Sequence, residues 1–219
     1  MPQPRIKICC IASVEEARVA VDIGADALGL VARMPSGPGP IDDTVIASIA
    51  AATPIEVATF LLTSETEPEA VVDHVERCGT STVQLVDTVP IATYRALRQH
   101  CPSAAIVQVL HVTGATTVDE ACSLAPHVDA LLLDSGNPTA TIKELGGTGR
   151  VHDWEVSRRI VAAVAVPVFL AGGLNAGNVA GAVQMVRPYG VDVCSGVRTG
   201  GALDPDKLAA YVSAVREAA

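Results

Sequence analysis

The stretch Val166-Pro-Val-Phe-Leu-Ala-Gly-Gly-Leu-Asn175 decides the fold of this chain. Its first six residues form the unbroken apolar run that is typical of a strand buried on both faces of a parallel sheet. Gly172 and Gly173 follow, and their missing side chains let backbone N–H groups approach a ligand closely. Asn175 is predicted to cap a helix that extends to about Val186. Bare N–H groups beside a helix N-terminus suit a phosphate.

The same pattern recurs in Gly190–Gly196, a strand that ends in Ser195 and Gly196. Two such loops in succession near the C-terminus are typical of the phosphate site that follows strands 7 and 8 of a (β/α)8 barrel. We therefore predict that Gly172, Gly173, Ser195 and Gly196 bind a phosphate. The alternative is a pair of tight strand–helix turns that bind no ligand.

The composition fits one sizeable core. The chain has 219 residues, of which 49% are hydrophobic, and its mean hydropathy is +0.39. No apolar run approaches the ~20 residues that span a bilayer, and the N-terminus shows no signal-peptide pattern. The net charge of −9 argues against nucleic acid as the main partner. We expect a cytoplasmic protein, either a monomer or a homodimer, that contacts neither membrane nor nucleic acid.

The six cysteines show no CxxC pair and no zinc spacing, so no metal site is predicted. Cysteines of a cytosolic chain are expected to be free thiols, most of them buried. We apply that expectation to Cys78, Cys101, Cys122 and Cys194.

Strands and helices alternate along the whole chain. We expect strands at residues 5–11, 26–32, 55–62, 82–86, 105–112, 129–134, 166–171 and 190–196. We expect helices between them, after a cap at Ser13 and then at about 42–52, 68–78, 91–100, 118–125, 154–163, 175–186 and 205–218. Eight such units predict a single-domain (β/α)8 TIM barrel over residues 1–219. An open doubly wound sheet is the alternative, but it would need a glycine-rich loop where Cys9–Ser13 stands.

Candidate catalytic groups lie where the strands end, because barrel enzymes place their chemistry there. Cys9 and Cys10 end the first strand, and strand alternation points only one of them into the barrel. A thiol with a lowered pKa serves there as a base or nucleophile; otherwise the pair is two small buried hydrophobes. Lys7 lies on the same face as Cys9 and is suited to hold an anion or to favour the thiolate.

Asp134 closes a strand of leucines at the barrel mouth. Partial desolvation would raise its pKa and make it a general acid, although a turn aspartate is the alternative. His111, at the end of the fifth strand, faces the mouth if the register is right. The other histidines, at positions 74, 100, 127 and 152, are expected on the surface.

Taken in order, these pieces resemble the phosphoribosylanthranilate isomerase family. The matching segments are Lys7–Ile11, Gly24–Gly29, Val83–Leu85, Leu131–Ser135, Gly146–Gly149 with Asp153-Trp154, Leu170–Asn175 with Asn178-Val179, and Val191–Val197. They span nearly the whole chain, and the ordered set is far more specific than any one piece. The family consists of barrel enzymes that perform an Amadori rearrangement in tryptophan biosynthesis.

The resemblance assigns roles that the residues alone leave open. It implies Cys9 as general base and Asp134 as general acid. It also implies that Gln84 and Gly147 contact a phosphorylated sugar substrate, beside Lys7 and His111. Acid–base chemistry of this kind needs no metal or redox cofactor.

Several positions depart from the family pattern. The family has Gly after the catalytic cysteine, where Cys10 stands. It carries Ser-Pro-Arg after strand 2, and that arginine is associated with the anthranilate carboxylate; the loop here, Met34–Pro40, has no arginine, so Arg33 is the nearest substitute. Gln108 and His111 replace a lysine and an arginine of strand 5, and Arg198 replaces a glutamate. Two alternatives therefore stay open: a related isomerase acting on another phosphorylated sugar, and a non-catalytic barrel that binds a phosphorylated ligand.

Overall fold

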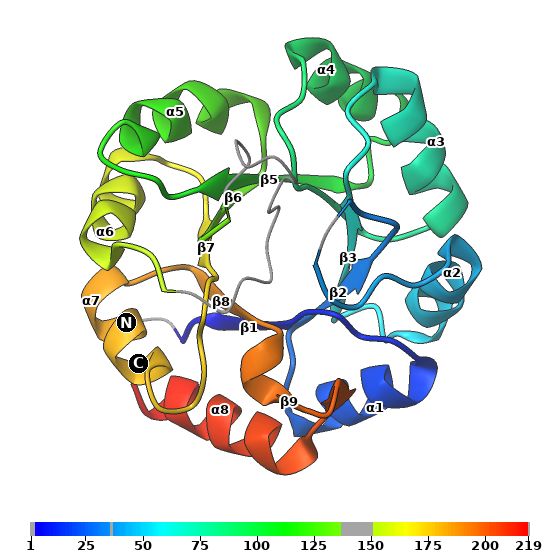
Figure 1. Cartoon of the computed structure of the whole chain (residues 1–219). Coiled ribbons are helices and arrows are strands. Elements are labelled where there is room, and N and C mark those ends of the chain that lie inside the picture. Colours follow the sequence, from blue (N-terminus) through cyan, green and yellow to red (C-terminus); the bar gives the residue numbers. More distant parts are fainter. Residues whose placement is uncertain (1–2, 36, 137–150, 219) are drawn as a thin grey trace.

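Eight parallel strands close into a barrel, and helices surround it (Figure 1). The computed structural model describes residues 3–35, 37–136 and 151–218. The barrel strands are β1 (Arg5–Ile8), β2 (Ala27–Val31), β3 (Ala58–Thr63), β4 (Thr82–Leu85), β5 (Ala105–His111), β6 (Ala130–Asp134), β7 (Val168–Leu170) and β8 (Gly190–Val193). Strand β1 pairs with both β2 and β8, which closes the ring. The predicted barrel is confirmed.

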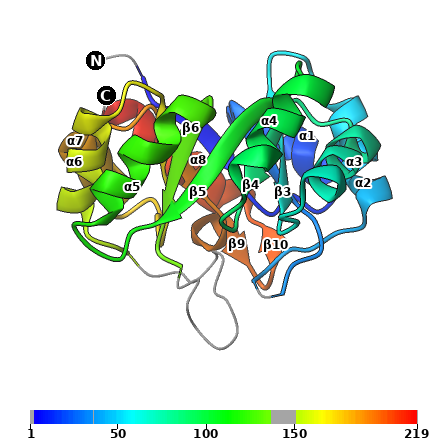
Figure 2. The same ribbon diagram turned by 90° about the horizontal axis from the view of Figure 1, so that it is seen from above.

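The helices follow the strands in the expected order. They are α1 (Val14–Ile23), α2 (Asp43–Ala52), α3 (Pro68–Cys78), α4 (Ile91–His100), α5 (Thr117–Leu124), α6 (Trp154–Ala163), α7 (Val179–Val186) and α8 (Pro205–Glu217). A short hairpin, β9 (Arg198–Thr199) with β10 (Ala202–Leu203), was not predicted and precedes α8. Figure 2 shows this hairpin at the end of the barrel where the strands finish.

Local signals explain where α1 and α3 begin and end. Ser13 accepts a hydrogen bond from the Glu16 N–H at 3.2 Å, and Gly24 ends α1 with a φ of 115°. Helix α3 starts on Pro68, whose missing N–H would have no partner in the first turn, and it stops before Gly79 at a φ of 63°. Left-handed backbone favours glycine at both ends.

The start of α7 differs from the prediction. The N-cap is Asn178, not Asn175, and the helix begins three residues later than expected. The Asn175 Oδ1 atom instead accepts from the Gly177 N–H at 2.9 Å, which closes a local turn. Asparagine side chains compete with helix in this way, so a residue with cap chemistry stands here in the preceding loop.

Each strand divides its side chains between two buried layers. One face packs against the helices, as Ile6, Ile8 and Leu61 do. The other fills the barrel interior, as Phe60 and Leu132 do. Alternation along each strand therefore decides which polar residues reach the interior. In the described parts of the chain, no helix combines the length and apolar character needed to cross a membrane.

Candidate active site

Cys9 lies inside the barrel mouth, just beyond the end of β1. Its side chain is 6% exposed and packs with the interior cluster. A Cβ added to Gly29 on the neighbouring strand would come within 2.8 Å of the Cys9 Sγ and 3.0 Å of the Lys7 Nζ. Glycine at this position thus leaves room for both side chains.

Lys7 is fully buried beside Cys9 and forms an ion pair with Asp192, Nζ to Oδ1 at 3.0 Å. Burial opposes the charge on Lys7, but the charges of Asp192 and Cys9 outweigh it and raise the lysine pKa. Lys7 and Asp192 face each other in the β1–β8 register. Sequence reasoning missed Asp192, although an interior lysine signals a nearby carboxylate.

Asp134 ends β6 and is 9% exposed. Burial raises its pKa, as does the negative charge of Asp192, against a hydrogen bond from the Ser135 N–H to Oδ1 at 2.7 Å. The shift favours the protonated carboxyl, which is the form a general acid needs. The buried carboxyl with a raised pKa that the sequence predicted is therefore present, and its role as general acid stays a prediction.

The Cys9 thiol is also held in its neutral form. Burial raises its pKa to about 11, although the positive charge of Lys7 opposes the shift. Asp192 and Asp134 add to it. The negative charge of Asp134 thus acts on the Cys9 thiol, and the positive charge of Lys7 favours ionisation of both groups.

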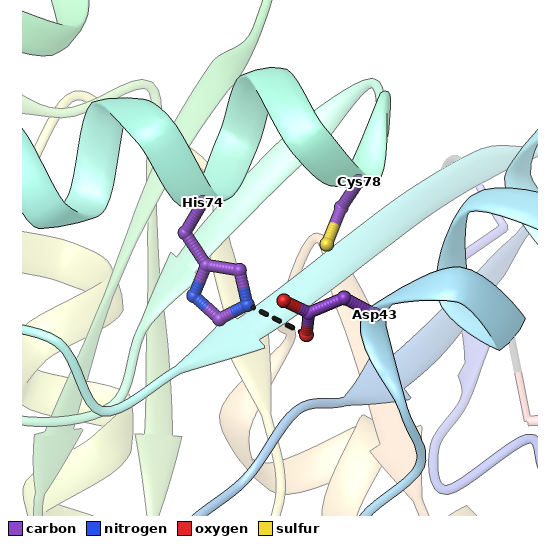
Figure 3. Close-up of side chains that lie close together, drawn as sticks. All are labelled: Asp43, His74 and Cys78. Atoms are coloured by element: carbon purple, nitrogen blue, oxygen red, sulfur yellow. Dashed lines mark hydrogen bonds and ion pairs between the residues drawn. The ribbon is translucent and has the colours of Figure 1, made fainter.

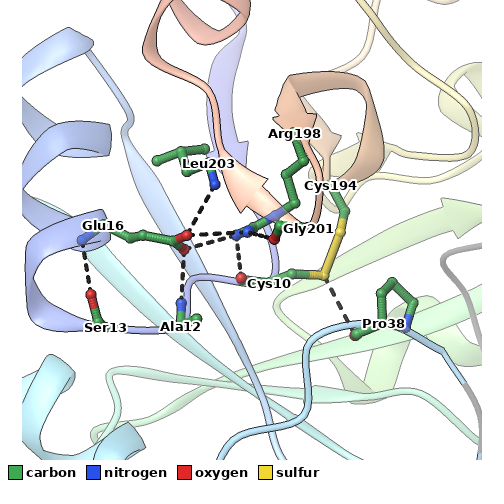
Figure 4. Close-up of polar contacts among 9 residues, drawn as sticks. All are labelled: Cys10, Ala12, Ser13, Glu16, Pro38, Cys194, Arg198, Gly201 and Leu203. Carbon is green, nitrogen blue, oxygen red and sulfur yellow. Dashed lines mark hydrogen bonds and ion pairs between the residues drawn. A yellow bond between two sulfur atoms is a disulfide. The ribbon is translucent and has the colours of Figure 1, made fainter.

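Cys10 differs from Cys9 in its backbone conformation and in being disulfide-bonded. Its φ of 64° takes the chain out of strand geometry, and its sulfur is bonded to Cys194 at the end of β8 (Figure 4). The expectation that Cys194 is a free thiol is wrong, because strands β1 and β8 are neighbours and bring the two cysteines together. Cys122 is free but exposed, whereas Cys78 and Cys101 are free and buried as predicted.

The two loops predicted to bind phosphate lie against each other. Gly172 and Gly173 both have left-handed backbone, with φ of 83° and 64°. A Cβ on Gly196 would overlap the Leu174 carbonyl oxygen, so glycine is required for this contact. No other described residue accepts a hydrogen bond from the N–H groups of these three glycines or of Ser195. The loops after β7 and β8 thus form one surface bearing free N–H donors.

Two further polar residues predicted to contact substrate face the barrel interior. Gln84 is 3% exposed, and its Oε1 accepts no hydrogen bond from any described residue. Both ring nitrogens of His111 are buried and also lack a partner in the described ranges. His111 stands beside Asp134 in the β5–β6 register. Acceptors and donors left open at the mouth are suited to a polar ligand.

Arg33 and Gly147 are the remaining predicted contacts, and Gln108 was named only as a departure from the family pattern. Arg33 is exposed after β2, and its guanidinium bonds to no other described residue. Gly147 lies outside the described residues. Gln108 faces the helices, not the mouth, because its position in β5 differs by one residue from the interior positions.

A second polar cluster, Asp43, His74 and Cys78, lies in the helix layer (Figure 3). The His74 Nε2 is 3.2 Å from the Asp43 Oδ1, and its Nδ1 is 2.9 Å from the Thr63 Oγ1. Arg77 donates to the other Asp43 oxygen at 2.7 Å. These bonds already use the Asp43 and His74 atoms that would ligate a metal, so we assign the cluster a structural role.

Two histidines were wrongly expected on the surface. His74 is buried within that cluster. His152 is half-buried beside Ser157, and burial lowers its pKa to about 4. A hydrogen-bond partner makes each burial tolerable. Asp43 is 31 positions from His74, whereas Ser157 is five positions from His152.

The fold and the site together define a class of protein. A (β/α)8 barrel with a buried carboxyl, a buried thiol and a surface of backbone N–H groups at its mouth has the features of barrel enzymes that act on phosphorylated substrates by proton transfer.

Comparison with known proteins gives the family within that class. Residues 6–214 match the model for N-(5'-phosphoribosyl)anthranilate isomerase, and the chain belongs to this family of isomerases. The isomerase of Halobacterium salinarum is 38% identical over 95% of this chain and 94% of its own. The isomerase structure from Thermotoga maritima aligns with a TM-score of 0.82 and 28% identity, covering 98% of this chain and 99% of that one. An isomerase bound to reduced 1-(o-carboxyphenylamino)-1-deoxyribulose 5-phosphate aligns with a TM-score of 0.79 and 26% identity, with the same coverage.

Proposed function

We propose that this chain rearranges N-(5'-phosphoribosyl)anthranilate to 1-(2-carboxyphenylamino)-1-deoxyribulose 5-phosphate, with Asp134 as general acid and Cys9 as general base. The observation that carries the assignment is the pair itself. Both side chains are buried at the mouth, on strands that are not neighbours, and burial raises the pKa of each. One group can thus protonate one part of a substrate while the other accepts a proton elsewhere on it.

The reaction starts with a proton transfer from Asp134 to the ribose ring oxygen, which opens the ring to a Schiff base. Cys9, as thiolate, then removes the proton from the sugar C2. The resulting enolamine tautomerises to the ketone product. Lys7 favours the thiolate by its charge, and Asp192 holds Lys7 in place through the 3.0 Å ion pair.

The phosphate is bound by the backbone of the loops after β7 and β8, through Gly172, Gly173, Ser195 and Gly196. Their N–H groups, which donate to no other described residue, and the contact of Gly196 with Leu174 support this role. Gln84 and His111 bind polar groups of the substrate from the opposite side of the barrel, because the Gln84 Oε1 and both His111 ring nitrogens have no partner among the described residues.

Arg33 is proposed to bind the anthranilate carboxylate. It follows β2, and no described residue pairs with its guanidinium, which can therefore bind a ligand. Arg33→Ala is expected to raise KM about tenfold, in the range of a lost charged hydrogen bond. Steady-state kinetics check this, with Arg159→Ala on the exposed face of α6 as the matched control. An unchanged KM for Arg33→Ala would remove Arg33 from the site.

We further propose that residues 1–219 act as one catalytic domain, as a monomer or homodimer, in the cytoplasm. The family match over residues 6–214 and the closure of the barrel by β1 with β8 support a single functional unit.

The alternative activity is isomerisation of another phosphorylated sugar. The absence of an arginine from Met34–Pro40 favours it, since the carboxylate then lacks its usual partner. A continuous assay with freshly made phosphoribosylanthranilate, following the loss of anthranilate-type fluorescence, separates the two. Turnover by the wild type is expected. No turnover by a folded protein that still binds inorganic phosphate would favour the alternative.

A further inference from the structure

The Cys10–Cys194 disulfide joins the two parts of the barrel mouth that the reaction uses (Figure 4). Cys10 directly follows the proposed base, Cys9. Cys194 directly precedes Ser195, which belongs to the proposed phosphate surface. The two cysteines are 184 positions apart in the chain, with Cα atoms 5.9 Å apart. The bond therefore sets how far the base can move from the phosphate.

A polar network holds the same two loops together independently of the disulfide. Arg198 donates to the Cys10 carbonyl oxygen and forms an ion pair with Glu16 at 2.9 Å. Glu16 also accepts from the N–H groups of Ala12 and Leu203, each at 3.0 Å. The loop after β1 and the β9–β10 hairpin thus stay connected when the disulfide is open. Opening the disulfide is expected to loosen the mouth without unfolding the barrel.

The loop after β2 also rests on Cys10. The Cys10 Sγ lies 3.7 Å from the Pro38 carbonyl oxygen, and a Cβ on Gly39 would stand 2.7 Å from the Cys10 Cβ. A reduced Cys10 thiol can donate to that carbonyl, whereas the disulfide cannot. The oxidation state of Cys10 therefore affects contacts of the loops after β1, β2 and β8.

The backbone of Cys10 shows that this position is held under constraint. A φ of 64° is uncommon for any residue other than glycine, asparagine or aspartate. The disulfide and the hydrogen bond from Arg198 both act on Cys10 and offset that cost. Opening the disulfide removes one of the two restraints.

We propose that Cys10 and Cys194 form a redox clasp, a reversible disulfide whose closed state holds the base loop and the phosphate loop in the geometry that binds substrate. The clasp rests on the proposed function of these loops. Reduction then weakens binding of the phosphorylated substrate more than it slows the chemical step. Disulfides of intracellular proteins are commonly transient and redox-sensing, which fits a switch of this kind.

The exchange is chemically balanced with a low-molecular-weight disulfide as oxidant. The Cys194 thiolate, which is half-buried and more accessible than Cys10, attacks that disulfide and releases one small thiol. The Cys10 thiolate then attacks the Cys194 sulfur and releases the second. The protein loses two protons and two electrons, and the small disulfide gains them. Cys9 takes no part because it is buried as the neutral thiol.

The test compares the protein after treatment with oxidised glutathione and after treatment with dithiothreitol. Peptide mapping after alkylation reports whether Cys10 and Cys194 are joined. We expect the KM for phosphoribosylanthranilate to be about fivefold lower in the oxidised protein, because the site is preorganised. We expect kcat to change by less than about twofold, since the acid and base are untouched.

Two variants complete the design. Cys10→Gly keeps a residue suited to the left-handed backbone but cannot close the clasp, so its KM should stay at the reduced value under both treatments. Cys122→Ser removes an exposed thiol on α5 and should respond to both treatments as the wild type does.

The proposal is overturned if Cys10 and Cys194 can still be alkylated after treatment with oxidised glutathione. It is also overturned if the disulfide forms but the KM is the same in the oxidised and the reduced protein. Titration with inorganic phosphate by calorimetry keeps the test separate from the proposed activity. If neither state turns over phosphoribosylanthranilate, tighter phosphate binding in the oxidised state still supports the clasp. Equal phosphate affinity in that case contradicts it.

Discussion

Two buried glutamines, one on each face of the barrel wall, differ in how their amides are satisfied. Gln108 faces the helices, where its Oε1 accepts from the Tyr94 hydroxyl at 2.7 Å and its Nε2 donates to backbone carbonyls such as that of Leu85. Gln84 faces the interior, where its Oε1 has no partner among the described residues. Both are almost fully buried. One amide is complete without a ligand, and the other is not.

Two histidines repeat the contrast. His74, in the helix layer, has partners for both ring nitrogens, whereas His111, at the mouth, has none in the described ranges. Buried polar groups are normally paired, so an open group inside the mouth indicates a place kept for ligand. Gln108 and His74 in the outer layer are therefore assigned to stability, and Gln84 and His111 in the inner layer to binding.

We expect the largest effect on stability from the Lys7–Asp192 ion pair, in which two side chains of the barrel interior satisfy each other. Lys7→Met leaves Asp192 as an unpaired buried charge and should lower the free energy of unfolding by about 3–5 kcal/mol. Urea unfolding measures the change. The double variant Lys7→Met/Asp192→Leu removes both charges and should recover most of the loss. A loss below about 1 kcal/mol for the single variant would mean that the pair is well hydrated.

The two glutamines should respond oppositely to the same substitution. Gln108→Leu leaves the Tyr94 hydroxyl and backbone carbonyls unpaired and should cost about 1–3 kcal/mol of stability with little change in KM. Gln84→Leu should leave stability within about 0.5 kcal/mol but raise KM, because only ligand contacts are lost. Urea unfolding and kinetics on both variants provide the test. Equal destabilisation by the two would remove the distinction between the layers.

The pH dependence of kcat/KM should follow the raised pKa values of Asp134 and Cys9. The active form has a protonated Asp134 and an ionised Cys9. Because the pKa of Cys9 lies above that of Asp134, this form is a small and constant fraction of the protein between the two pKa values. The fraction falls below the Asp134 pKa, where the thiolate becomes rarer, and above the Cys9 pKa, where the protonated carboxyl becomes rarer. The acid limb should therefore lie above the ordinary aspartate pKa of about 3.9, and no fall should occur before about pH 10. A fall centred near about pH 8.5, the ordinary thiol value, would contradict the burial of Cys9.

Sequence patterns were informative wherever the signal is local. Strand–helix alternation predicted the barrel, and α3 spans the predicted residues 68–78 with Pro68 in its first turn. The prediction of the α7 N-cap was wrong because Asn175 and Asn178 offer the same chemistry three residues apart.

Contacts between distant segments were not predictable in the same way. The Cys10–Cys194 bond depends on the adjacency of the first and last barrel strands, and the burial of His74 depends on Asp43 from another helix. Asp192 was within reach of inference, since Lys7 requires a partner and β8 is the neighbour of β1. Contacts between the first and last barrel strands were thus the ones that the sequence did not predict.

The most direct test of the central claim is the rate of phosphoribosylanthranilate turnover by Cys9→Ser and Asp134→Asn beside the wild type. Each change removes a proton-transfer group without altering the size of the side chain much, so folding should be retained by circular dichroism. We predict that kcat falls about 10²-fold or more in each variant. Near-wild-type turnover in both folded variants would contradict the assignment of Cys9 and Asp134 as base and acid.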